Sequence, residues 1–212
     1  MLFSVLLSVL DGSRFKKHST TENTEEHREQ HRGMPHTLQT ERLILREFTE
    51  ADIPELVPLI GAREIAATTL RIPHPYEEKH AREFFATVPK ENELRLAIRL
   101  RGTGRLCGGI GLHPEMQHPR AELGYWIGVP FWGKGYATEA ASALIEYGFQ
   151  NLKLERIFAS HFKGNDRSGR VLQKIGMRHE GSVRHGVMKA GKLLDVENYA
   201  IVRETGLPAI QK

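Results

Sequence analysis

The feature that most constrains the fold is a glycine-rich turn between a strand-like run and a helix-like run. The turn lies within residues 128–140, which read GVPFWGKGYATEA. Residues 121–127 suit a strand, and residues 137–152 place apolar side chains at helical spacing. Glycine lets the backbone curl tightly, and the first amides of a helix have no partner inside it and lie at its electropositive end. The pattern therefore predicts a strand–turn–helix unit whose main-chain N–H groups bind phosphate oxygens.

Two common phosphate-binding loops match this turn incompletely. The nucleoside-triphosphate loop, G-x-x-x-x-G-K-[ST], fits residues 128–134, but Gly135 replaces the hydroxyl residue that binds magnesium. No strongly apolar strand ends in the second aspartate that such a site usually needs. The dinucleotide fingerprint, G-x-G-x-x-G, fails because Thr138 stands at its third glycine. A nucleoside-triphosphate protein stays an alternative on the near-match alone.

The residues around the turn resemble a different family, the coenzyme A-dependent GNAT acetyltransferases. Their pyrophosphate loop reads [QR]-x-x-G-x-[GA], and residues 132–137 match it except that Trp132 replaces the usual Gln or Arg. Four strings are similar to the RimJ/RimL branch of that family, in the right order between about residues 37 and 203. They are LQTERLILR (38–46), ELGYWIG with FWGKGYATEA (122–140), NDRS (165–168) and VLQKIGM (171–177).

The resemblance implies acetyl-CoA as the co-substrate and assigns residues to it. The loop amides and the Lys134 charge would hold the diphosphate, the splayed end of the strand around residue 126 would align the pantetheine arm, and Asn165 would meet the cofactor where it leaves the cleft. Plain packing roles for Tyr125 and Trp126, and a helix N-cap role for Asn165, stay open beside these. The expected cofactor-binding residues are Tyr125, Trp126, Ile127, Trp132, Gly133, Lys134, Gly135, Tyr136, Ala137, Thr138 and Asn165.

Two further residues are candidates for proton transfer. Glu122, at the start of the central strand, is the best carboxylate to accept the proton of the incoming amine, although a structural Glu facing solvent is an alternative. Many GNAT enzymes protonate the leaving thiolate with a Tyr seven residues after the Asn, but that position holds Leu172. Ser168 is the remaining hydroxyl. It would either donate a proton or only hydrogen-bond the sulfur.

The predicted activity is N-acetyl transfer to a primary amine. At pH 7, removing a proton from a lysine of pKa ~10.4 costs about 4.6 kcal/mol, whereas an α-amine of pKa ~8 costs about 1.4 kcal/mol. Modest acid–base equipment therefore favours the α-amine of a protein N-terminus, which the RimJ/RimL resemblance also implies. The alternatives are a small-molecule amine (polyamine, amino acid or antibiotic) and a CoA-binding module without turnover.

Composition sets limits on partners and domains. The chain of 212 residues is 40% apolar and 26% charged, as expected for one domain of ordinary size. Residues 16–32 include no aliphatic or aromatic side chain, so we expect residues 1–34 to be a disordered or extraneous extension and residues 35–212 to form a single acetyltransferase domain. The net charge of +4 is too small and scattered to indicate nucleic acid. We expect a cytoplasmic monomer or homodimer without a membrane partner.

Metal binding and disulfides are not expected. The single cysteine, Cys107, lies in an apolar run and is interpreted as a packing thiol. The early histidines match no ligand spacing; they stand at positions 18, 27, 31 and 36.

The remaining pattern predicts a mixed α/β (α+β) sheet, mostly antiparallel, flanked by helices and splayed at its central strand. Strands are expected near residues 42–48, 94–101, 106–112, 120–129 and 155–162, with two more flanking the turn at 189–192. Helices are expected over 49–60 (irregular because of two prolines), around 81–88, over 137–152 and over 165–176.

Overall fold

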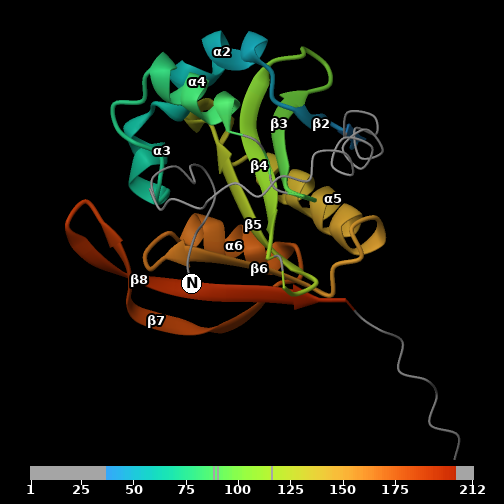
Figure 1. Cartoon of the computed structure of the whole chain (residues 1–212), viewed down its shortest axis with the longest axis vertical. Coiled ribbons are helices and arrows are strands. Elements are labelled where there is room, and N and C mark those ends of the chain that lie inside the picture. The colour runs from blue at the N-terminus through green and yellow to red at the C-terminus, as the bar shows by residue number, and fades with distance from the viewer. Residues whose placement is uncertain (1–36, 88, 90, 116, 204–212) are drawn as a thin grey trace, which may run out of the picture.

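The computed structural model describes residues 37–203, apart from 88, 90 and 116. The expected extension at residues 1–34, its histidines and Val88 lie outside the described residues. The rest forms one eight-stranded sheet with the order β1-β2-β3-β4-β5-β6-β8-β7 (Figure 1). Its strands are β1 (Leu38–Gln39), β2 (Leu43–Glu47), β3 (Leu94–Leu100), β4 (Leu106–Pro114), β5 (Arg120–Ile127), β6 (Arg156–Phe162), β7 (Arg178–Lys189) and β8 (Lys192–Val202).

Every neighbouring pair of strands is antiparallel except β5 and β6, which run parallel. Strand β8 lies between β6 and β7, so the long final hairpin completes the sheet beyond β6. The structure thus confirms the mixed, mostly antiparallel sheet that the sequence predicts.

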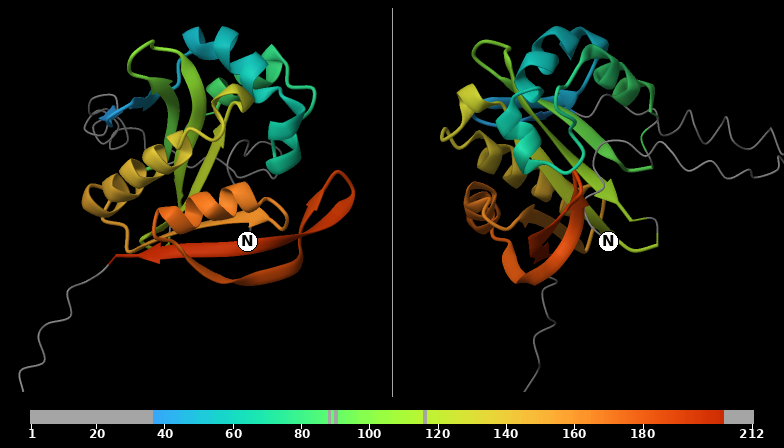
Figure 2. Two further views of the ribbon diagram at one scale, coloured as in Figure 1. Left: turned by 180° about the vertical axis from the view of Figure 1, so that it is seen from behind. Right: turned by 90° about the vertical axis from the view of Figure 1, so that its left-hand side faces the viewer.

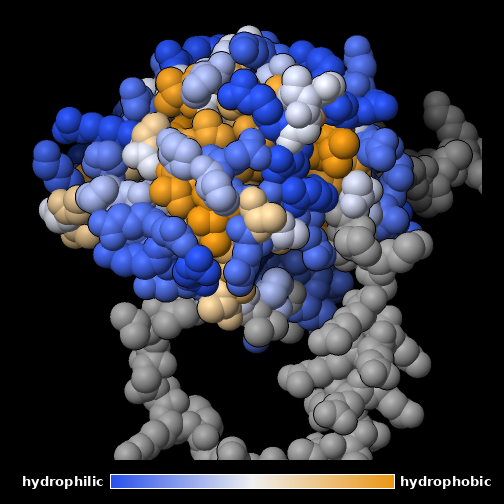
Figure 3. All heavy atoms as spheres, turned by 90° about the horizontal axis from the view of Figure 1, so that it is seen from above, coloured by the Kyte–Doolittle hydropathy of each residue, from blue (hydrophilic) through white to orange (hydrophobic). Residues whose placement is uncertain are grey.

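Helices cover both faces of the sheet (Figure 2). Helix α5 (Tyr136–Gln150) and helix α6 (Asp166–Lys174) pack on the face that holds the larger apolar core, which includes Leu96, Leu123 and Leu144. A second core, around Ile65 and Trp126, lies under the helices of the other face. These are α2 (Ile53–Ile60), α3 (Arg63–Thr68) and α4 (Glu78–Ala86). The surface seen in Figure 3 is mostly hydrophilic, with apolar patches between polar side chains.

The irregular helix that is expected over residues 49–60 is confirmed, but it consists of two parts. A 3-10 turn, η1 (Glu50–Asp52), precedes α2, and Pro58 lies inside α2. The Thr49 N–H donates to the Asp52 carboxylate at 2.8 Å, so the two residues that mark the helix start do contact each other. Pattern analysis missed helix α3, strand β1 and the 3-10 turn η2 (Val129–Phe131), since each has six residues or fewer and too short a period to detect.

Candidate active site

A cleft opens where β5 and β6 part. The two parallel strands pair only at Arg120–Glu122 with Arg156–Phe158, while β5 stays paired with β4 as far as Ile127. The edge of β5 that faces β6 is therefore not covered by β6 beyond Glu122. The resulting cleft measures about 1100 Å³ and is lined by parts of residues 64–69, 125–127, 131–138 and 162–174. This is the splay that the sequence predicts, and its volume suits a large ligand.

The glycine turn forms one wall of this cleft. Gly133 and Gly135 have φ of +75° and +81°, values that side chains larger than glycine rarely adopt. The Glu139 N–H donates to the Gly135 carbonyl at 3.0 Å, as in the first turn of an α-helix. The amides of residues 136–138 precede that bond and have no acceptor within α5. A Cβ added to Gly133 would contact nothing within 4 Å, so the turn is open toward the cleft. The geometry is that of an anion-binding cradle.

An arginine from β2 braces the turn from behind. Arg42 donates to Glu139 in the first turn of α5 at 2.7 Å and to the Lys134 carbonyl at 3.0 Å. Thr40 also donates to Glu139, at 2.6 Å. Burial opposes the charge of Glu139, but these hydrogen bonds hold the pKa of its carboxyl below the usual value. Sequence reasoning missed this brace because its partners lie 97 residues apart.

Trp132 stands where the motif usually has Gln or Arg, and it makes contacts to two other elements. Its indole N–H donates to the Ile127 carbonyl at 2.6 Å, which ties the turn to the end of β5. The Arg167 guanidinium lies 4.6 Å from the ring centroid, which is cation–π distance. Trp132 therefore links the turn to β5 and to the first turn of α6. Lys134 lies over the Phe131 ring at 5.6 Å.

The opposite wall carries Asn165 and Ser168. Asn165 caps α6: its side-chain oxygen accepts from the Ser168 N–H at 3.3 Å, and its amide nitrogen donates to Ser168 Oγ at 3.0 Å. The expected N-cap role is therefore confirmed, and it leaves the Ser168 hydroxyl proton available to another acceptor. Leu172, at the position of the missing tyrosine, is 1% exposed.

The three residues at the end of β5 all line the cleft but face different ways. The Tyr125 hydroxyl donates to the Ser168 carbonyl at 3.4 Å and so spans the splay, and burial raises its pKa to about 12. Ile127 packs in the core under α5, whereas Trp126 packs in the core on the other face. The packing roles left open for Tyr125 and Trp126 thus exist beside their place in the cleft wall.

Glu122 lies at the point where β5 and β6 separate. It pairs in register with His113 on β4 and with Phe158 on β6. Its exposed fraction is 6%, so the alternative of a solvent-facing Glu is wrong. Glu122 is close to the splay in the chain but does not line the cleft.

Comparisons with known proteins agree with this geometry. A family model described as an acetyltransferase (GNAT) domain matches residues 42–178. The chain belongs to the GNAT acetyltransferase family. The uncharacterized N-acetyltransferase YoaA of Bacillus subtilis (strain 168) is 35% identical over 170 residues, covering 78% of this chain and 96% of YoaA. YdaF of the same organism, provisionally named a ribosomal N-acetyltransferase, is 39% identical over 101 residues, covering 47% and 55%.

Solved structures agree as well. A GNAT-family acetyltransferase from Bacillus anthracis superposes with a TM-score of 0.72 at 29% identity, covering 79% of this chain and 98% of that one. The suspected family is therefore confirmed, and the match to YdaF is consistent with the RimJ/RimL-like branch.

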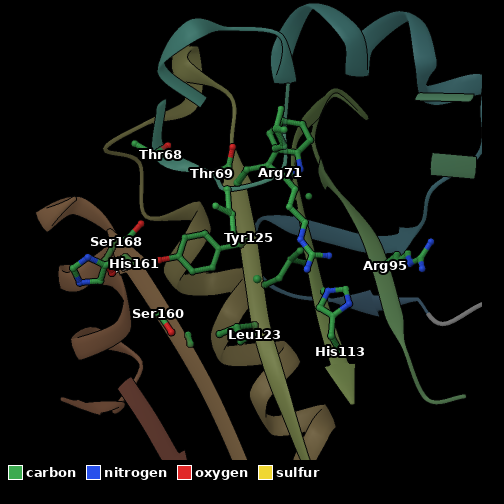
Figure 4. A pocket seen from close by; sticks show the side chains of 18 of the residues that line it. Thr68, Thr69, Arg71, Arg95, His113, Leu123, Tyr125, Ser160, His161 and Ser168 are labelled. Carbon is green, nitrogen blue, oxygen red and sulfur yellow. Dashed lines mark hydrogen bonds between the residues drawn. The ribbon is translucent and has the colours of Figure 1, made fainter. Parts of the chain in front are cut away.

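A smaller cavity of about 100 Å³ adjoins the cleft on the α2–α4 face of this GNAT domain (Figure 4). Register places Gly109, Gly111 and Gly124 on this face, and these glycines line the cavity together with side chains from the surrounding elements. Those side chains include Thr69, Arg71, Arg95, His113, Ser160 and Ser168. Because Tyr125, Asn165 and Ser168 line both spaces, the cavity meets the cleft at the start of α6. Sequence reasoning found no residue of this pocket beyond those shared with the cleft.

Three further features concern the cysteine, metal ligands and membrane-spanning helices. Cys107 is fully buried and burial raises its pKa to about 12, so the packing interpretation is confirmed. Over the described ranges, no group of three His, Cys, Asp or Glu side chains is arranged to hold a metal ion. No helix within residues 37–203, as far as the structure describes them, is both long and apolar enough to cross a membrane.

Proposed function

We propose that the protein transfers the acetyl group of acetyl-CoA to the α-amine of a protein N-terminus. The observation that carries the proposal is the cleft, which joins an anion-binding helix start to the uncovered edge of a splayed strand. A cytoplasmic enzyme, monomeric or homodimeric, is part of the proposal.

The residues that line the cleft suit the diphosphate, the pantetheine arm and the thioester of acetyl-CoA. The amides of residues 133–138 would bind the diphosphate, and Lys134 would add a positive charge nearby. The uncovered main chain of Tyr125–Ile127 would pair with the amide groups of the pantetheine arm, and one of its N–H groups would polarise the thioester carbonyl. Asn165 and Ser168 would then lie near the sulfur, at the junction of the cleft and the smaller cavity.

Ser168 is suited to the leaving thiolate. Because its Oγ accepts from Asn165, its proton is free to point into the cleft. A hydroxyl of ordinary acidity stabilises a thiolate by a hydrogen bond more easily than by full proton transfer. Glu122, which the sequence predicts as proton acceptor, is buried beside the point of separation and lines neither the cleft nor the smaller cavity.

The smaller cavity supports a peptide N-terminus over a polyamine. Two arginines, Arg71 and Arg95, line it, and none of its described lining residues is an Asp or Glu. Arg95 is already paired with Glu93, which does not line the cavity, so a polycation would find no lining carboxylate to pair with its amines. A peptide brings one amine together with carbonyl oxygens, which arginine side chains can bind.

An acceptor panel tests the proposal. Purified protein is supplied with acetyl-CoA and either N-terminal peptides, spermidine, free amino acids or aminoglycosides, and released CoA is measured by thiol reaction. We expect turnover with peptides, blocked when the peptide N-terminus is already acetylated. Turnover with small amines alone would support the small-molecule alternative. Acetyl-CoA binding with no CoA release for any amine would support a non-catalytic module.

A further inference from the structure

A histidine in the smaller cavity has the surroundings of a proton acceptor. His113, near the end of β4, is 8% exposed. Its Nδ1 lies 2.8 Å from Glu93 Oε1, whereas its Nε2 is buried without a hydrogen-bond partner among the described residues. A Cβ added to Gly111 would lie 2.7 Å from Nε2, so this nitrogen lies directly over a glycine that lines the cavity.

The contact with Glu93 fixes which nitrogen carries the proton. An ionised carboxylate can only accept hydrogen bonds, so Nδ1 is the donor and Nε2 keeps its lone pair. Glu93 is held in turn by Arg95, with nitrogen–oxygen distances of 3.0 and 3.1 Å, and Arg95 donates to Thr87 at 2.6 Å. A base oriented by a carboxylate, which is itself fixed by further hydrogen bonds, is the arrangement used in many enzymes to activate a nucleophile.

Burial, with two nearby arginines, keeps His113 neutral. Burial lowers its pKa below the usual value, the Glu93 carboxylate acts in the opposite direction, and the positive charges of Arg95 and Arg71 lower it further. Arg71 reaches toward His113 in Figure 4. Glu122 lies opposite His113 on β5 and is the remaining titratable residue on this side of the sheet next to it. At pH 7 the imidazole is therefore ready to accept a proton, and once protonated it is stabilised by Glu93.

We propose that His113, oriented by Glu93, accepts the proton of the acceptor amine in this cavity. The inference rests on the proposed acetyl transfer. As the amine nitrogen bonds to the thioester carbonyl carbon, the carbon–sulfur bond breaks and its electron pair stays on sulfur. The proton lost by nitrogen passes to His113 Nε2 and then to solvent, and the sulfur takes one proton from solvent. His113 and Ser168 line opposite walls of the same cavity. His113 can therefore accept the proton of the amine while Ser168 hydrogen-bonds the sulfur.

The test is the pH dependence of kcat/KM for three variants. In the wild type we expect an acid limb, with activity falling as His113 becomes protonated below pH ~6.5. His113→Gln should reduce kcat/KM by about 100-fold at pH 7.5 and remove that limb. Glu93→Gln should move the limb to lower pH, because Glu93 raises the pKa of His113. The matched control His118→Gln, at an exposed position in the β4–β5 connection, should keep the wild-type profile.

Melting temperature and the Kd for acetyl-CoA separate folding from catalysis. If His113→Gln does not fold, the shift of the acid limb in Glu93→Gln still tests the role of His113. A His113→Gln enzyme with wild-type kcat/KM and an intact acid limb would overturn the inference, as would loss of that limb in Glu122→Gln alone. If the wild type binds acetyl-CoA but acetylates no amine, the proposed function fails instead, whatever the variants do.

Discussion

Single residues explain how this domain departs from the family pattern. At position 132 the usual Gln or Arg is absent, and the sequence alone offers no reason for a tryptophan there. In the structure the indole N–H reaches the Ile127 carbonyl and the ring meets Arg167. The tryptophan therefore stabilises the turn by contacts to two other elements, which no local pattern could reveal.

Trp132→Phe tests that role. Phenylalanine keeps a ring for Arg167 but leaves the Ile127 carbonyl, on a buried residue, without its donor. We expect the free energy of unfolding to fall by about 1–2 kcal/mol, measured by urea denaturation. Arg167→Ala, which removes only the cation–π contact, should cost about 0.5–1 kcal/mol. Equal stability of Trp132→Phe and the wild type would show that the indole hydrogen bond contributes nothing.

At the scale of elements, the start of α5 depends on β2. Arg42 neutralises Glu139, a carboxylate in the first turn of a helix proposed to bind an anion. Arg42→Ala would leave that negative charge facing the ligand and free the Lys134 carbonyl. We expect isothermal titration calorimetry to show that the Kd for acetyl-CoA rises about tenfold. Arg82→Ala, which removes an exposed ion pair on α4, should bind as the wild type does. An unchanged Kd for Arg42→Ala would mean that the turn holds its shape without the brace.

A second set of contacts joins strands β2 and β3 to η1, the turn that leads into α2. Asp52 is 1% exposed and accepts hydrogen bonds from Arg46, Arg99 and the Thr49 amide. Burial opposes its charge, but Arg46, the Thr49 amide and Arg99 together hold the pKa of its carboxyl below the usual value. Because the folded-state pKa is lowered, this stabilisation is present above the unfolded pKa of about 3.9 and is lost as pH falls through the folded value.

Asp52→Asn should therefore reduce the free energy of unfolding by about 3 kcal/mol at pH 7, since Arg46 loses its charged partner and Arg99 keeps only Glu55. The difference from the wild type should stay constant down to about pH 5 and narrow below about pH 4. Urea denaturation across this range measures it. A difference independent of pH down to the folded pKa would show that lost packing, not lost charge, is responsible.

Sequence patterns predicted the longer helices and strands, in which the apolar repeat is seen several times. They missed the features that depend on contacts between residues far apart in the chain. The apolar stripe of α5 and the alternation of apolar and polar residues in β3 can be recognised in the sequence. An element that packs on one face repeats its apolar residues at a regular spacing. The glycine turn is equally visible, since only glycine tolerates its dihedral angles. In contrast, nothing local marks His113 and Glu93 as partners, 20 residues apart on opposite sides of the β3–β4 hairpin. The sequence thus predicts the glycine-turn wall of the cleft far better than the lining of the smaller cavity.

For the whole molecule, the sheet is joined across the cleft by a short stretch of strand pairing. Strands β1–β5 with α5 lie on one side, and β6–β8 with α6 lie on the other. Between them β5 and β6 share only three residue pairs, with side-chain contacts such as Tyr125 to the Ser168 carbonyl. A ligand that touches both walls of the cleft adds contacts between the two parts, and it does so only in the folded protein.

Ligand-dependent melting therefore tests the whole arrangement. Acetyl-CoA at 100 times its Kd should stabilise the fold by about 2.7 kcal/mol, which for a domain of this size raises Tm by roughly 5–11 °C. ATP with magnesium at the same concentration should leave Tm unchanged, because Gly135 offers no hydroxyl to the metal. Differential scanning fluorimetry of the wild type and Arg42→Ala measures both, and the variant should respond only at higher acetyl-CoA concentration. A shift with ATP and none with acetyl-CoA would assign the glycine turn to a nucleoside triphosphate and overturn the proposed use of the cleft.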